Sequence, residues 1–202
     1  AKIALWEYTD SASGDMGYVY GQPTIAKVRN GANSYAWAVI FGNGYNSTNE
    51  NAVLYVVNAV TGVLIKKIVL NPDYDATWNA TGVTPFINSN GLSMPAVVDT
   101  NSDYIADYVY AGDLRGNMWK IDLTSTSTSS WDSAYKSGND PRPLFKAADG
   151  SGNAQPITVQ PEVGAHPDGQ SGYMVYFGTG QYIATGDNAA AASPVQTFYG
   201  IW

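Results

Sequence analysis

Residues Asp99–Leu123 read DTNSDYIADYVYAGDLRGNMWKIDL, and they contain the pattern from which the fold is inferred. A loop rich in Asp and Asn is followed by an apolar strand, Tyr108–Gly112, then by a turn and a second strand, Asn117–Ile121. Aromatic and β-branched residues between short turns favour strands over helices. The stretch therefore predicts part of an antiparallel β-sheet.

The same pattern occurs three times along the chain. Pro23, Pro95 and Pro161 each open an apolar strand, and they recur at intervals of 72 and 66 residues. A second strand that ends in glycine follows each proline, and then a third strand. The predicted second strands are Ala38–Gly42, Tyr108–Gly112 and Met174–Gly178, and the predicted third strands are Ala52–Val57, Asn117–Ile121 and Gln196–Ile201. Repeated antiparallel meanders are typical of a β-propeller.

The predicted fold class is all-β, and the chain is expected to be a segment of a modified β-propeller made of antiparallel blade-like meanders. Residues 1–202 would form part of one propeller domain, with units at about 18–75, 91–145 and 155–202. Propellers generally need four to eight blades to close, so we expect the three units to belong to a larger propeller. A self-contained β-sandwich is the alternative.

Four further segments are assigned from their composition. Leu64–Leu70 is predicted to complete the first unit as an outer strand, and Ala4–Tyr8 is predicted to be an orphan outer strand. The Ser/Thr tract Thr124–Ser130 and the Ala/Asn/Ser stretch Asp187–Ser193 are predicted to be linkers or long loops.

The composition excludes several functional classes. The 202 residues carry a net charge of -7 without a cluster of Lys or Arg, so nucleic acid is not an expected partner. No apolar run approaches ~18 residues, so no membrane span is expected in this segment. The chain has no Cys, and His166 is its one histidine, which argues against thiol chemistry, a zinc site or a Ser-His-Asp triad.

The loop Asp99–Asp107 carries the candidate chemistry. Asp99, Asn101, Asp103 and Asp107 place side-chain oxygens at positions 1, 3, 5 and 9, and Ile105 at position 7 offers its backbone carbonyl. This is the spacing of an EF-hand-like loop, in which Ca²⁺ takes six to eight oxygen ligands. Three carboxylates so close together would repel one another without a cation. The predicted cofactor is Ca²⁺, held by these five residues.

Two positions depart from a full EF-hand loop. Tyr104 stands at position 6, where Gly usually makes the sharp turn, so we expect a different turn there, and Tyr110 replaces the Glu of position 12. The alternative is a polar hairpin loop whose Asp and Asn side chains cap turns. With the units aligned on their second strands, no carboxylate stands opposite the three aspartates. The opposing residues are Arg29, Asn33 and Trp37 in the first unit and Ala165, Gly169 and Tyr173 in the third. A blade evidently does not require carboxylates there, which favours calcium.

The run Asp99–Leu123 resembles the diagnostic segment of the PilY1/PilC family, the type IV pilus tip-associated adhesins and biogenesis factors. Other segments resemble the family in the same order, namely Leu5–Val28, Trp37–Ser47, Gly91–Asp99 and Tyr176–Trp202. The resemblance implies a modified β-propeller domain whose calcium loop matches the five ligands named above. The family usually has Gly where this chain has Tyr104.

The resemblance also implies a function. It predicts an exported, non-enzymatic protein at the bacterial cell surface, pilus tip or outer membrane that binds calcium, promotes pilus extension, opposes retraction and supports twitching motility, virulence and attachment. Its expected partners are pilus components such as minor pilins and a host-cell or surface receptor. Two alternatives remain open. One is a quinoprotein-like dehydrogenase, which the run Asp113–Trp119 resembles, and the other is a carbohydrate- or protein-binding scaffold in which calcium is only structural.

Overall fold

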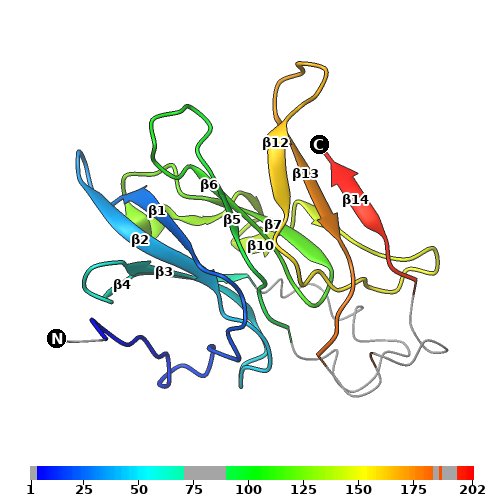
Figure 1. The fold of residues 1–202 in the computed structure, drawn as a ribbon, viewed down its shortest axis with the longest axis horizontal. Helices are drawn as coiled ribbons and strands as arrows, with labels where there is room; N and C mark the ends of the chain where they lie inside the picture. Colours follow the sequence, from blue (N-terminus) through cyan, green and yellow to red (C-terminus); the bar gives the residue numbers. More distant parts are fainter. Residues whose placement is uncertain (1–3, 71–89, 184–186, 188–194) are drawn as a thin grey trace.

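The computed structural model describes residues 4–70, 90–183, 187 and 195–202. Its strands form three larger antiparallel sheets, which follow one another across the molecule in chain order (Figure 1), and a two-stranded ribbon. In these described ranges, the helical structure is a single 3-10 turn, Thr128–Ser130, and no helix is long and apolar enough to cross a membrane. The predicted all-β class is confirmed.

The first sheet has four strands in chain order, which are β1 (Thr24–Arg29), β2 (Tyr35–Gly42), β3 (Ala52–Asn58) and β4 (Leu64–Leu70). Neighbouring strands are antiparallel throughout, as the meander pattern predicts. Six successive residues of β3 are buried, because both faces of this strand are covered. β4 begins and ends where the sequence places it.

The second sheet has the order β11-β7-β6-β5, with β8 paired to β7. Its strands are β5 (Ala96–Val98), β6 (Tyr108–Gly112), β7 (Asn117–Asp122), β8 (Asp132–Ser133) and β11 (Phe145–Lys146). The separate ribbon consists of β9 (Tyr135–Ser137) and β10 (Asp140–Arg142). The strands β8 to β11 were not predicted, because two or three residues are too few to show an alternating pattern.

The third sheet has the order β12-β13-β14, with bounds Glu162–Ala165, Tyr173–Gly178 and Phe198–Ile201. One hydrophobic core joins the first sheet to the second and includes Ile40, Leu54 and Trp119. A second core joins the second sheet to the third and includes Met118 and Phe177. Face-to-face packing of successive meanders is the arrangement that blades of a propeller adopt.

The prediction of a strand at Ala4–Tyr8 is wrong. These residues form no strand, and their aromatic side chains instead cover the outer face of the first sheet. The Trp6 indole Nε1 donates a hydrogen bond to the Ala59 carbonyl at 3.0 Å, which fixes the segment across the sheet. The predicted loop Thr124–Ser130 ends in the 3-10 turn, and residues 188–193 of the other predicted loop lie outside the described residues.

The repeated prolines lie where the innermost strands meet. β5 lies beside both β1 and β12. The Pro95 carbonyl accepts hydrogen bonds from Thr24 Oγ1 at 3.2 Å and from Gln160 Nε2 at 2.6 Å. Nearby, a methyl group on Gly42 would overlap with the carbonyl oxygens of Leu92 and Ser93, so the first sheet meets the second there backbone to backbone.

Candidate calcium site

The Asp99–Asp107 loop connects β5 to β6 and rises at the same edge of the molecule as the β12–β13 connection (Figure 1). Both neighbouring sheets hold it. The Ala106 backbone N–H donates to the Lys27 carbonyl of β1 at 2.8 Å, and the Tyr173 hydroxyl of β13 donates to the Thr100 carbonyl at 3.3 Å. The position of the loop is therefore fixed relative to all three sheets.

Side-chain oxygens at alternate positions shape the loop. Asp99 Oδ1 accepts the backbone N–H of Asn101 at 3.1 Å, and Asp99 Oδ2 accepts that of Tyr104 at 2.7 Å. Asn101 Oδ1 accepts the N–H of Asp103 at 2.9 Å, and Asp103 Oδ1 accepts the N–H of Ile105 at 2.8 Å. Successive Asx turns of this kind wind the chain so that positions 1, 3 and 5 share one turn.

The expectation of a different turn at position 6 is wrong. Tyr104 has a φ of 65°, so it adopts the left-handed conformation that glycine usually supplies. Its side chain is 86% exposed and gains no packing in return. A non-glycine residue in this region costs about 1 kcal/mol or more, which the hydrogen bond from its N–H to Asp99 offsets in part.

Arg29 of β1 reaches into the loop, and sequence reasoning did not place it in the site. Its Nη1 donates to Asp107 Oδ1 at 2.9 Å and to the Ala106 carbonyl at 3.1 Å, and its Nη2 donates to Asp103 Oδ2 at 3.3 Å. The other oxygen of Asp107 accepts both the backbone N–H and the hydroxyl of Thr100, at 2.9 and 2.6 Å. Asp107 is thus buried and fully hydrogen-bonded.

The electrostatics favour an ionised Asp99. Desolvation by its surroundings raises the pKa of Asp99, but hydrogen bonds from the backbone N–H groups of Tyr104, Asn101 and Ser102 outweigh it, so the pKa lies below its ordinary value. At neutral pH Asp99 is therefore a carboxylate whose charge a cation can neutralise.

The structure brings the five predicted ligands onto one loop, and Arg29 contacts two of them. Hydrogen bonds within the loop join Asp99, Asn101 and Asp103, and Arg29 contacts the carboxylates of both Asp103 and Asp107. In the described part of the chain, no three His, Cys, Asp or Glu side chains are grouped closely enough to hold a metal ion. The donor set consists of oxygens, which is what Ca²⁺ prefers, and one oxygen of each aspartate accepts a single hydrogen bond and so keeps a second lone pair. These oxygens are Asp99 Oδ2, Asp103 Oδ1 and Asp107 Oδ1. The loop fits calcium in its chemistry and winding, provided that Arg29 gives up Asp107.

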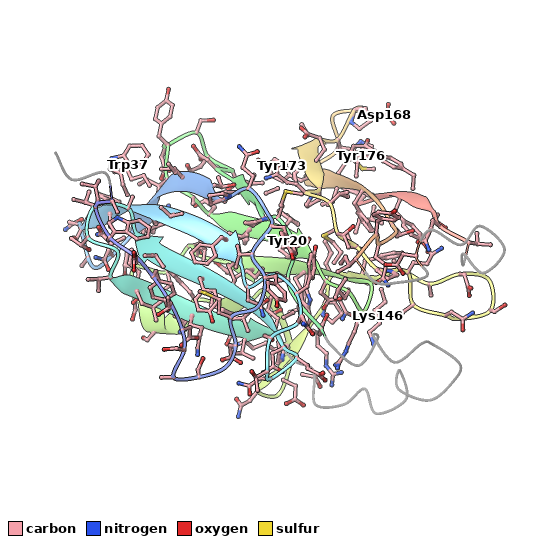
Figure 2. The ribbon with its side chains drawn as sticks, turned by 60° about the horizontal axis from the view of Figure 1, so that its bottom comes forward. Tyr20, Trp37, Lys146, Asp168, Tyr173 and Tyr176 are labelled. Carbon is pink, nitrogen blue, oxygen red and sulfur yellow. The ribbon has the colours of Figure 1, made fainter. Side chains whose placement is uncertain are left out.

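The corresponding connections of the other two sheets are built differently. Between β1 and β2, the Ser34 N–H donates to the Gly31 carbonyl, and the Asn30 N–H donates to the Ser34 carbonyl. Between β12 and β13, the Gly169 N–H donates to the His166 carbonyl, while Asp168 is exposed near the tip of that loop (Figure 2). The β12–β13 connection adds one side-chain acceptor, His166 Nδ1, which accepts the Asp168 N–H at 3.2 Å. Neither connection is wound by successive Asp and Asn side chains.

The run Asp113–Trp119 has a structural explanation. The Asp113 side chain is completely buried and accepts hydrogen bonds from the Trp119 indole at 2.8 Å, from the Asn117 side chain at 2.9 Å and from the Asn90 side chain at 3.0 Å. Gly116 in the turn has a φ of 77° and no room for a Cβ beside the Ala147 carbonyl. These contacts account for the run without a quinone cofactor.

A cavity of about 320 Å³ lies apart from the loop, beside the approach to β1. Its lining includes Tyr20, Gln22, Met94 and Tyr182, and none of the five predicted calcium ligands. Tyr20 stacks on Tyr18 with ring centroids 6.0 Å apart, and both rings are exposed. This aromatic surface is a separate feature, and it adds no ligand to the loop.

Comparisons with known proteins agree with this architecture. A type IV pilus biogenesis factor PilY1 homologue of Xylella fastidiosa is 44% identical over 200 residues, which are 98% of this chain and 13% of the relative. The type IV pilus biogenesis factor PilY1 of Pseudomonas aeruginosa is 39% identical over an alignment of 210 positions, which covers 98% of this chain and 17% of the relative. These relatives are named as biogenesis factors and not as enzymes, in agreement with the non-enzymatic expectation. The chain spans less than a fifth of their length.

The fold is similar to a solved structure, the crystal structure of the Pseudomonas aeruginosa PilY1 C-terminal domain. The TM-score is 0.77 and the identity 39%, and the match covers 98% of this chain and 40% of that one. The family described as the PilY1 beta-propeller domain matches residues 8–202. The predicted resemblance and the propeller architecture are thereby confirmed, and the chain belongs to the PilY1 β-propeller domain family.

Proposed function

We propose that this chain is the calcium-binding part of a non-enzymatic type IV pilus biogenesis factor. The observation that carries the proposal is the Asp99–Asp107 loop, whose oxygen-bearing side chains already wind it into successive Asx turns inside a PilY1-family β-propeller. The other two first-to-second strand connections lack this arrangement, so it serves a purpose other than closing the blade.

Five residues would hold the ion. Asp99, Asn101, Asp103 and Asp107 would supply side-chain oxygens, and Ile105 would supply its backbone carbonyl. Bound Ca²⁺ would supply the positive charge that the aspartates need to approach one another. Tyr173 of the third sheet and the Lys27 carbonyl of the first sheet both bind the loop. Ordering of the loop by calcium would therefore affect both of these sheets.

The biological role follows from the family. The protein would act at the bacterial surface or pilus tip, with minor pilins and other pilus components as partners. It would promote pilus extension, oppose retraction and support attachment to a surface or a host-cell receptor. Calcium bound to the loop would act as the switch between pilus extension and retraction.

Isothermal titration calorimetry with CaCl₂ tests the site directly. The wild-type chain is expected to bind with a Kd of roughly 10⁻⁶ to 10⁻³ M. Asp99→Ala should lose the binding heat, because it removes both a ligand and the acceptor that winds the loop. Asp168→Ala, an exposed aspartate in the corresponding loop of the third sheet, is the matched control and should bind as the wild type does. Absence of heat in the wild type, or full binding by Asp99→Ala, would contradict the site.

Pilus counts on cells that produce the whole protein with Asp107→Ala, at unchanged expression, test the regulatory role. We expect fewer surface pili, and a return toward wild-type numbers when retraction is blocked. At a hundredfold excess of calcium over Kd, the wild type should gain about 2.7 kcal/mol of stability. If that stabilisation is seen while the loop variant is normally piliated, calcium is only structural.

A further inference from the structure

We infer that Arg29 is a competing cation built into the calcium loop, so that calcium binds only by displacing its guanidinium group from Asp107. The inference rests on the calcium site proposed above and adds how that site is regulated. It makes Arg29, which lies at the end of β1 in the first sheet, a determinant of the affinity of a loop in the second sheet.

The hydrogen bonds of Asp107 carry the argument. Its Oδ2 accepts two hydrogen bonds from Thr100, at 2.9 and 2.6 Å, and its Oδ1 accepts Arg29 Nη1 at 2.9 Å. The Thr100 contacts close the loop from its first turn to its last residue and would be retained when the ion binds. Oδ1 is therefore the oxygen that Asp107 can offer to calcium, and Arg29 holds it.

Burial makes the competition effective. The side chains of Arg29 and Asp107 are only 14% and 3% exposed, so solvent screens their attraction weakly. A guanidinium and a divalent cation that share one carboxylate in such surroundings repel each other strongly. Arg29 also holds Asp103 Oδ2 at 3.3 Å, so two of the proposed ligands share its single positive charge. Part of the negative charge that attracts calcium is thus compensated internally in its absence.

The exchange would also change which parts of the fold are joined. Arg29 ties β1 to the loop through the Ala106 carbonyl and through both aspartates. When calcium takes Asp107, the ion pairs that join the first sheet to the loop are released, while the backbone bond from Ala106 to Lys27 can remain. Calcium would thus exchange a contact between sheets for a contact within the loop.

Linkage gives this inference a quantitative test. Suppose that Arg29 stabilises the calcium-free chain and not the calcium-bound one. The factor by which its substitution lowers the folding equilibrium constant of the calcium-free chain must then equal the factor by which it raises the calcium affinity. A residue that merely supports the loop would do the opposite, because its removal would weaken calcium binding and destabilise both forms.

The experiment compares Arg29→Gln with Lys27→Gln in the same chain. Lys27 lies two residues away on the same strand and contacts the Tyr35 ring at 4.6 Å, so it controls for the loss of one positive charge. We expect calorimetry with CaCl₂ to show about tenfold tighter binding for Arg29→Gln and less than a twofold change for Lys27→Gln. Urea unfolding should show Arg29→Gln destabilised in EDTA but not in saturating calcium.

Unchanged or weaker calcium binding by Arg29→Gln, while the wild type binds, would overturn the inference and leave the proposed calcium site intact. No binding by the wild type would instead overturn the proposed function itself. Arg29→Lys covers the case in which Arg29→Gln does not fold. A lysine keeps the charge but cannot form the two-pronged contact with Asp103 and Asp107, so its affinity should lie between those of the wild type and the glutamine variant. Binding weaker than that of the wild type would count against displacement.

Discussion

Two clusters of aspartates in this chain are each held by one basic side chain, yet their surroundings differ. In the N-terminal cluster, Lys67 of β4 contacts Asp10 at 3.0 Å and Asp15 at 2.9 Å. In the Asp99–Asp107 loop, Arg29 contacts Asp103 at 3.3 Å and Asp107 at 2.9 Å. The two arrangements have the same pairing of charges and similar distances.

The remaining hydrogen bonds separate them. Asp10 also accepts the Tyr55 hydroxyl at 2.6 Å, and Asp15 accepts the Asn49 side chain at 2.8 Å, so side chains from β3 and from the β2–β3 connection contact the N-terminal cluster. In the loop, Asp99, Asn101 and Asp103 Oδ1 accept backbone N–H groups that lie within five residues of the acceptor. The first cluster fixes a covering segment onto a sheet, whereas the second is a wound loop that one arginine contacts. The source of the hydrogen-bond partners, more than the number of carboxylates, therefore separates a structural cluster from a candidate ion site.

Asp15→Ala should have the largest effect on stability. The substitution leaves Lys67 with one carboxylate partner and removes a buried acceptor of the Asn49 side chain, so we expect a loss of about 3 kcal/mol. Urea unfolding followed by tryptophan fluorescence measures it. Calcium affinity should not change. A change in calcium affinity above about threefold would mean that the two clusters are coupled.

Asp107→Ala should have the next largest effect on stability and, unlike Asp15→Ala, it should also abolish calcium binding. It removes the acceptor of Thr100 and one of the two carboxylate partners of Arg29, so we expect a loss of about 2 kcal/mol in the absence of calcium. Calcium binding should disappear in calorimetry. Asp168→Ala, at an exposed site, should change stability by less than about 0.5 kcal/mol. Retained calcium binding by Asp107→Ala would remove this residue from the ligand set.

Tyr104→Gly should stabilise the loop. Tyr104 has a φ of 65° and an exposed ring, so glycine relieves strain without loss of packing, and we expect a gain of about 1 kcal/mol or less. Thermal unfolding in EDTA measures the gain, and calcium should bind at least as tightly as to the wild type. Gly138→Ala is the opposite control and should lose stability. It introduces a side chain at a residue whose φ is 64°, in a position where the added Cβ meets no other atom. A loss of stability in Tyr104→Gly would show that the tyrosine ring makes a favourable contact.

The pH dependence of the N-terminal cluster should be the smallest effect. Partial burial raises the pKa of Asp10 and Asp15, but hydrogen bonds from Ser13, Asn49 and Lys67 outweigh it, so both pKa values lie below the ordinary one. Their contribution to stability is therefore present above pH about 4 and is lost as the pH falls through the lower folded-state values. The urea midpoint of the wild type should fall below pH 4, and that of Asp15→Asn should fall less. Equal slopes for the two proteins would contradict this assignment.

Much of the fold and of the loop could be predicted from the sequence, because both depend on local patterns. The recurrence of Pro and Gly located the first, second and third strands. The Asp and Asn side chains of Asp99–Asp107 cap turns, as the alternative to a calcium loop predicted, and calcium binding itself stays a prediction. The role of Arg29 could not be predicted, because it depends on a contact between residues 78 positions apart. Ala4–Tyr8 was assigned to a strand because its apolar residues resemble one, but the segment packs by its side chains instead of pairing by its backbone.

The close approach at Gly42 has a mechanical consequence. The first sheet touches the carbonyl oxygens of Leu92 and Ser93 with no side chain between them. Ser93 in turn donates from both its N–H and its hydroxyl to the carbonyl of Gly112, the last residue of the strand that starts just after Asp107. A force that pushes the first sheet against the second would pass along this line of peptide groups, with no layer of side chains to absorb it, and would reach the strand that follows the loop.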